Sequence, residues 1–173
     1  MNKEKSLRLL TLGEINLGKT VFGNSIQWNK VWVHCDSYLP FGLQGKFVGM
    51  SPNGEIYFRK ETYLKDFSLS SRASQHFFMH EITHVWQHQH GMWVRARGLF
   101  SWATAYQYTI VPNKKLSQYS MEQQAQIIAD YFLLKNYGVN GLKNEIGRQA
   151  GFQGVLDNNT LLLYRNILPE TIL

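Results

Sequence analysis

Two histidines and a glutamate near the middle of the chain occur as His80-Glu81-Ile82-Thr83-His84. Residues four apart lie on one face of an α-helix, so His80 and His84 can direct a ring nitrogen at the same ion. Glu81 is offset by one residue, and from there its carboxylate reaches a water beside the ion rather than the ion itself. We therefore predict a Zn²⁺ site with His80 and His84 as ligands and Glu81 as the general base of a hydrolase.

The third protein ligand is open between two residues. His90 lies six residues after His84, as in the spacing HExxHxxGxxH, but Gln87 stands where that spacing has a turn-forming glycine. Glu122 lies in the first turn of a predicted helix, SMEQQAQIIADYF, whose alanines would let two helices approach closely. We favour Glu122, which would give two histidines and one glutamate with the fourth position left for water.

Other polar residues near the motif have weaker indications. Asp130 lies about 80° round the helix from Glu122, so it is expected to support a ligand or to lie on the surface. Tyr106, Tyr108 and Tyr119 are candidates for stabilising an oxyanion only by their type and their nearness in the sequence.

The helix that carries the motif is predicted to begin after Ser70 or Ser71 and to end at Gly91. Serine hydroxyls cap helix N-termini, and glycine takes the left-handed conformation that ends a helix. Apolar residues at helical spacing would bury the motif. A short pattern also arises by chance on histidine-rich amphipathic helices, and the central place of HExxH in this helix argues against that alternative.

Further capping pairs, alternating apolar runs and turn residues indicate the other elements. We expect helices over residues 12–21, 121–136 and 161–167, a strand over 26–34, and hairpin strands over 47–50 and 55–58; residues 98–110 are ambiguous between helix and strand. Strands followed by helices predict an α+β fold, a single domain over residues 1–173 with a small N-terminal β-sheet and an HExxH helix packed on further helices.

The composition is that of a folded protein with a basic surface. The chain has 173 residues, 44% hydrophobic, and a formal net charge of +6. Its lone cysteine, Cys35, excludes an internal disulfide and a cysteine-rich zinc site. Lysine and arginine are scattered and no recognition motif appears, so we expect no nucleic-acid partner. We see no signal peptide and no membrane-spanning stretch, which predicts a cytoplasmic protein that could leave its producing cell only by a signal-independent route.

Four segments together resemble a known family: LTLGEINLGKTVFGNSIQWNKVWVH, MSPNGEIYF, FFMHEITHVWQHQHG and SMEQQAQIIADYF. The chain resembles small bacterial proteins described as Vgr-related or Rhs-associated zinc metallopeptidases linked to type VI secretion. The resemblance implies a zincin-like fold, metal ligands at His80 and His84, and catalysis by Glu81. Glu122 resembles the third ligand of gluzincins, although Gln126 replaces the carboxylate usual four residues later. Delivery as an antibacterial effector, or service to the secretion apparatus, would follow.

The leading hypothesis is a zinc metallopeptidase that hydrolyses peptide bonds in protein or in cell-wall peptide (peptidoglycan). An edge strand such as 55–58 could pair with an extended substrate. Vgr or Rhs secretion components and an immunity protein are the partners that the resemblance suggests. The alternative is a zincin-fold binding or adaptor module without catalysis; the intact Glu81 weighs against it, because a structural metal site needs no general base.

Overall fold

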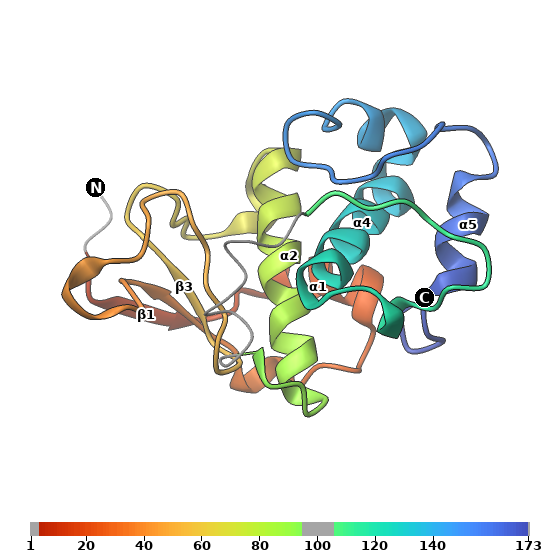
Figure 1. The fold of residues 1–173 in the computed structure, drawn as a ribbon. Helices are drawn as coiled ribbons and strands as arrows, with labels where there is room; N and C mark the ends of the chain where they lie inside the picture. The colour runs from red at the N-terminus through yellow and green to blue at the C-terminus, as the bar shows by residue number, and fades with distance from the viewer. Residues whose placement is uncertain (1–3, 95–105, 173) are drawn as a thin grey trace.

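The computed structural model describes residues 4–94 and 106–172, which form a small β-sheet followed by helices (Figure 1). Strand β1 (Ser6–Leu9) pairs antiparallel with β2 (Trp32–Cys35), and β2 pairs parallel with β3 (Ile56–Phe58). The helices are α1 (Leu12–Phe22), α2 (Arg72–Gln89), α4 (Met121–Lys143) and α5 (Thr160–Ile167), with 3₁₀ turns at Trp28–Lys30, Pro40–Gly42, Phe67–Leu69 and Leu116–Gln118. The predicted α+β class, with an HExxH helix packed on further helices, is confirmed.

The inner face of the sheet packs against the N-terminal half of α2. Alternate strand residues, among them Val33, Ile56 and Phe58, are fully buried. The Phe58 ring lies 4.8 Å from that of Phe67, which in turn stacks on Phe78 of α2. Aromatic contacts of this kind stabilise a core beyond the area that they bury. The sheet therefore fixes the position of the helix that carries the motif.

Helix α1 begins with the predicted capping box of Thr11 and Glu14. Glu14 is fully buried and accepts hydrogen bonds from both terminal nitrogens of Arg8 at 2.7 Å and from the backbone N–H of Phe67 at 3.0 Å. A bidentate arginine–carboxylate pair is strong and directional. This one carboxylate thus joins β1, α1 and the 3₁₀ turn that precedes α2.

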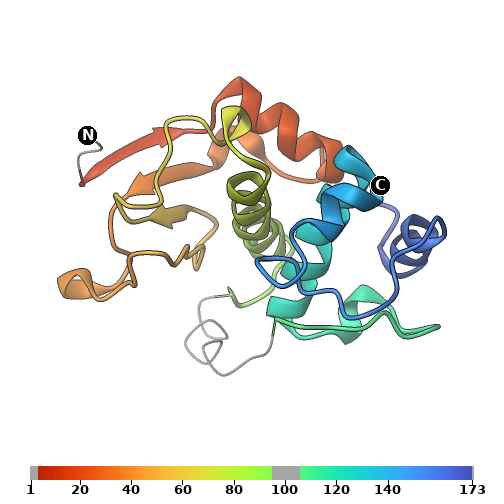
Figure 2. The same ribbon diagram turned by 90° about the horizontal axis from the view of Figure 1, so that it is seen from above.

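Helices α2 and α4 lie side by side and make the most extensive helix pairing in the described chain (Figures 1 and 2). The Ser71 hydroxyl caps α2, and Gly91, at φ 81°, follows its C-terminus. Ser120 opens α4 with the predicted capping box. The helix breaks at Gly138 (φ 70°) as predicted, but a further turn continues to Lys143. The caps therefore set where both helices begin. They also determine which part of α4 lies opposite the HExxH motif.

Two predictions about the strands need correction. The strand predicted over 26–34 starts only at Trp32, because Trp28–Lys30 form a 3₁₀ turn. The predicted hairpin is reduced to one antiparallel bridge, Met50–Tyr57, and β3 pairs in parallel with β2 instead. Register in a sheet depends on which partner lies alongside, and local turn residues such as Asn53-Gly54 do not reveal that partner.

The ambiguous stretch at 98–110 lies largely outside the described residues, which resume at Tyr106. Tyr108 bridges Phe152 in parallel, and residues 106–110 form neither a helix nor a longer strand. Among the described helices, none has both the length and the apolar character required to cross a bilayer.

Candidate metal centre

The HExxH motif lies near the middle of α2, with His80 and His84 on the side that faces α4. His80, Glu81 and His84 are all buried, with exposed fractions of 8%, 3% and 6%. Burial follows from the fold, since the sheet covers one side of α2 and α4 covers another (Figure 2). Glu122 stands in the first turn of α4 and is also buried, at 6%. These four buried polar side chains require hydrogen-bond or metal partners, because leaving a buried polar group unpaired costs free energy.

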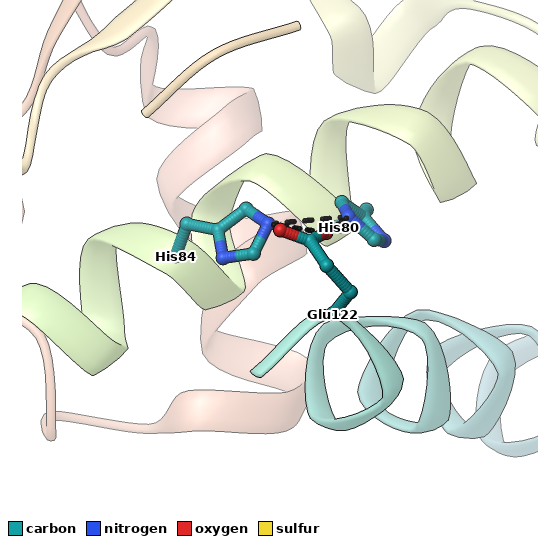
Figure 3. Close-up of side chains that lie close together, drawn as sticks. All are labelled: His80, His84 and Glu122. Atoms are coloured by element: carbon teal, nitrogen blue, oxygen red, sulfur yellow. Dashed lines mark hydrogen bonds and ion pairs between the residues drawn. The ribbon is translucent and has the colours of Figure 1, made fainter. Parts of the chain in front are cut away.

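The two histidines and Glu122 point their polar atoms at one another (Figure 3). His80 Nε2 lies 3.2 Å from Glu122 Oε2, His84 Nε2 lies 3.3 Å from the same oxygen, and the two nitrogens are 3.2 Å apart. The three atoms form a nearly equilateral triangle. In the part of the chain that the structure describes, Glu122 has no other hydrogen-bond donor.

The triangle fits a tetrahedral metal ion. Bonds of about 2.0–2.1 Å to nitrogen and oxygen, arranged tetrahedrally, place neighbouring ligand atoms about 3.3–3.4 Å apart. The observed edges of 3.2–3.3 Å are close to that spacing. Two imidazoles and one carboxylate form the donor set of catalytic zinc sites, which keep a fourth position open. The residues present therefore fit zinc.

Gln87 orients His84 within the triangle. Its Oε1 accepts a hydrogen bond from His84 Nδ1 at 2.8 Å, which leaves Nε2 as the nitrogen that faces the triangle. The amide nitrogen of Gln87 donates to the carbonyl of Met121 at 3.1 Å and to Gln124 at 3.3 Å. Such support fixes the tautomer and ring orientation of a metal-binding histidine. The residue that breaks the HExxHxxGxxH spacing thus has a role here.

Charge also marks the triangle as a cation site. Burial opposes a charged imidazole, but the hydrogen bond and charge of Glu122, with the charge of Glu81, raise the pKa of His84 to about 9. Burial would raise the pKa of Glu122, and the hydrogen bonds from His80 and His84 hold that pKa well below its usual range. These shifts favour a protonated His84 when no metal is bound. Metal binding would then release that proton, since a ligand histidine must be neutral.

Glu81 is held on the other side of the motif by the chain at residues 49–51. Ser51 Oγ donates to Glu81 Oε2 at 2.8 Å, and Ser51 is itself buried. A Cβ atom on Gly49 would lie 2.5 Å from Glu81 Oε1, so a larger residue at position 49 would displace the Glu81 side chain. The carboxylate is thus enclosed between helix and loop.

Two cavities meet at the motif, with volumes of about 890 Å³ and 440 Å³. Both are lined by Val48, Gly49, His80, Glu81 and Tyr106. The cleft therefore continues to either side of the triangle, as a site for an extended chain would require.

The segment at 47–52 borders this cleft, whereas the predicted substrate edge at 55–58 does not. Strand β3 pairs with β2 on one side, and Tyr57 pairs with Met50 on the other. Its hydrogen-bonding groups are therefore already used at that point, and the prediction for this edge is wrong.

Two other residues that the sequence suggested, His90 and Tyr106, differ in their distance from the triangle. His90 is exposed and pairs through Nδ1 with the carbonyl of Trp86, away from the triangle. Tyr106 lies with its ring 5.8 Å from that of His80. Burial and the charges of Glu122 and Glu81 raise the pKa of Tyr106, so its phenol stays protonated.

Tyr108, Tyr119 and Asp130 do not reach the triangle. The Tyr119 hydroxyl bonds to the backbone at residues 109 and 111. Tyr108 donates to Asp130, which is fully buried and holds His76 at 2.7 Å. Asp130 is therefore neither a surface residue nor a support for a proposed ligand. Gln126, at the position of the expected carboxylate, donates to Asp130 and to the carbonyl of Gln149.

Comparisons with known proteins give a sequence match and a structural match. No family model matches the chain. The type VI secretion system spike protein VgrG2b of Pseudomonas aeruginosa is 43% identical over 159 residues, which cover 87% of this chain and 15% of that protein. The chain thus spans only a small part of this curated relative. The solved structure of the effector domain of Pseudomonas aeruginosa VgrG2b has a TM-score of 0.68 and 38% identity, covering 88% of this chain and 87% of that one.

The structural match extends over most of both chains, and the buried triangle of His80, His84 and Glu122 supports the zincin-like class. The chain belongs to the family of the VgrG2b effector domain.

Proposed function

We propose that the protein is a zinc metallopeptidase that cleaves peptide bonds in protein or in cell-wall peptide. The observation that carries the proposal is the buried triangle of His80, His84 and Glu122, with Glu81 beside it at the meeting point of two cavities. When bound there, zinc would supply Lewis acidity and lower the pKa of a water to about 7.

Glu81 would act as the proton carrier of the hydrolysis. Its carboxylate accepts a proton as the water oxygen attacks the carbonyl carbon of the scissile bond. The same group then gives this proton to the leaving nitrogen as the C–N bond breaks, so the carboxylate is regenerated. Tyr106 lines both cavities and keeps its phenolic proton, which supports a role as hydrogen-bond donor to the developing oxyanion.

We further propose that the protein serves type VI secretion as an effector. The support is its membership of the family of an effector domain from a spike protein. On this proposal its partners are a Vgr or Rhs component of the secretion apparatus and an immunity protein.

Replacement of Glu81 by Gln tests the enzyme directly. Gln keeps the size of Glu but accepts no proton at neutral pH, so hydrolysis should fall by about 10²–10⁴-fold. Zinc content, measured by atomic absorption, should stay near that of the native protein because the three ligands are unchanged. Hydrolysis is followed on fluorescein-labelled casein and on purified peptidoglycan.

The adaptor alternative makes the opposite prediction. If a Glu81→Gln variant keeps the full biological effect of the native protein, catalysis is not its function. If the variant loses zinc instead, Glu81 is a ligand and the roles assigned to this helix are wrong.

A further inference from the structure

The loop that faces Glu81 does more than close the site. We propose that Ser51 is a positioning residue, which holds the Glu81 carboxylate in one orientation through the whole reaction. The inference rests on the proposed function, since it assigns a task within the same site. Ser51 Oγ lies 2.8 Å from Glu81 Oε2, and both residues are at least nine-tenths buried.

The serine is held in a braced segment. Met50, its neighbour, exchanges two backbone hydrogen bonds with Tyr57, of 3.1 and 2.8 Å. The buried side chain of Gln44 donates to the carbonyls of Val48 at 2.7 Å and Tyr57 at 2.9 Å. A buried donor that joins two chain segments in this way limits their relative movement. The backbone at Ser51 is therefore fixed, and this holds the Ser51 hydroxyl in place beside Glu81.

Gly49 restricts the other oxygen of the same carboxylate. Glu81 Oε1 lies where a side chain at position 49 would begin, so the carboxylate fits between Gly49 and Ser51 with little free space. Helix α2 fixes the Cα of Glu81, and the loop fixes the far end of its side chain. A side chain held at both ends keeps its carboxylate in the geometry that proton transfer requires.

The choice of a hydroxyl has a chemical reason. A serine O–H donates to an ionised carboxylate, and after rotation about the Cβ–Oγ bond the same oxygen accepts from a protonated one. Glu81 alternates between these two states in the proposed reaction. A backbone N–H or a lysine in the place of Ser51 could only donate, and would favour the ionised state alone. Ser51 can keep its hydrogen bond in both.

Binding of acetohydroxamic acid to the zinc-loaded protein tests this role without knowledge of the natural substrate. The compound is a zinc ligand, and its N–H and O–H groups would donate to a carboxylate beside the metal, so its affinity would report on how well the Glu81 carboxylate is held in place. Ser51→Ala should weaken binding about three- to tenfold, because ordering one free side chain on binding costs about that factor. Ser51→Thr, which keeps the hydroxyl, should restore affinity to within about twofold. Calorimetry measures the Kd.

Two reference variants separate the possible failures. Ser25→Ala removes a hydroxyl that bonds to the Phe22 carbonyl, far from the motif in sequence, and should leave the Kd unchanged. Glu81→Gln should weaken binding at least as much as Ser51→Ala.

If Ser51→Ala binds like the native protein while Glu81→Gln does not, the role of Ser51 is refuted and the proposed function stands. If neither variant changes the Kd, both proposals fail. Loss of zinc or of the folded state in Ser51→Ala, with no recovery in Ser51→Thr, would show a structural role only.

Discussion

Helix α2 presents three histidines to α4 at intervals of four residues, and they meet carboxylates in two different ways. His80 and His84 face Glu122, whereas His76, one turn earlier, faces Asp130 at 2.7 Å. Both arrangements are buried and both join the same two helices. They differ in what else reaches the carboxylate, and this difference separates a metal site from a structural one.

Asp130 has its acceptor capacity filled. Apart from His76, it accepts hydrogen bonds from the Tyr108 hydroxyl at 2.8 Å and from the backbone N–H groups of Gly151 and Phe152 at 2.9 and 3.1 Å. A carboxylate offers about four lone-pair sites, so little remains for an ion. Glu122 faces only imidazole nitrogens among the described residues, so its buried negative charge requires a proton or a metal cation held among these three side chains.

Replacing Glu122 by Gln should have the largest effect. The change removes the charged ligand. Zinc affinity should then fall by on the order of 10²–10³-fold, because one ligand in four contributes about a quarter of the roughly 10–16 kcal/mol of such a site. Hydrolysis of labelled casein should fall to background with it. Competition with a fluorescent zinc chelator measures the affinity. Unchanged zinc binding would move the third ligand elsewhere, with His90 as the next candidate.

The corresponding substitution at position 130, Asp130→Asn, should affect stability instead of zinc binding. Asn at position 130 turns one acceptor into a donor that faces other donors, which should destabilise the metal-free protein by about 3 kcal/mol. Urea unfolding followed by tryptophan fluorescence gives the free energy of unfolding. Glu122→Gln is the matched control and should destabilise less, because its histidines can become neutral. Equal losses in the two variants would mean that the two clusters do not differ as described.

A smaller effect is expected at Gln87, which supports a ligand without touching the ion. Gln87→Ala should weaken zinc binding about 10- to 100-fold, the usual range for such supporting residues. His90→Ala, one turn of helix nearer the C-terminus, should leave zinc affinity unchanged. If the ranking of these two variants is reversed, the centre resembles the HExxHxxGxxH arrangement after all.

The sequence predicted what local spacing controls. The HExxH motif lies on one helix, and the capping boxes at Thr11 and Ser120 place helix starts within a residue or two. Glu122 was predicted as the third ligand from its place in the first turn of a helix whose alanines allow close approach, and its carboxylate lies beside His80 and His84. Each of these features depends on residues within about one or two helical turns, where side-chain directions follow from the helix itself.

Contacts between distant segments were not predictable in this way. Ser51 lies 30 residues before Glu81, and Asp130 lies 54 residues after His76. No periodicity links such pairs, because their approach depends on how the loops close. Parallel pairing of β3 with β2 was missed for the same reason. Gln87 was a local signal, because it stands where the HExxHxxGxxH spacing has glycine. In the structure its side chain accepts a hydrogen bond from His84.

The amides of Gly151 and Phe152 lie outside any helix, yet both point at the fully buried carboxylate of Asp130. Loop amides normally exchange their hydrogens with water through small local openings. Here an opening of that kind would leave a buried charge with fewer donors. Hydrogen exchange at these two positions is therefore coupled to disruption of the α2–α4 pair itself, and a segment without regular secondary structure reports on the opening of the core.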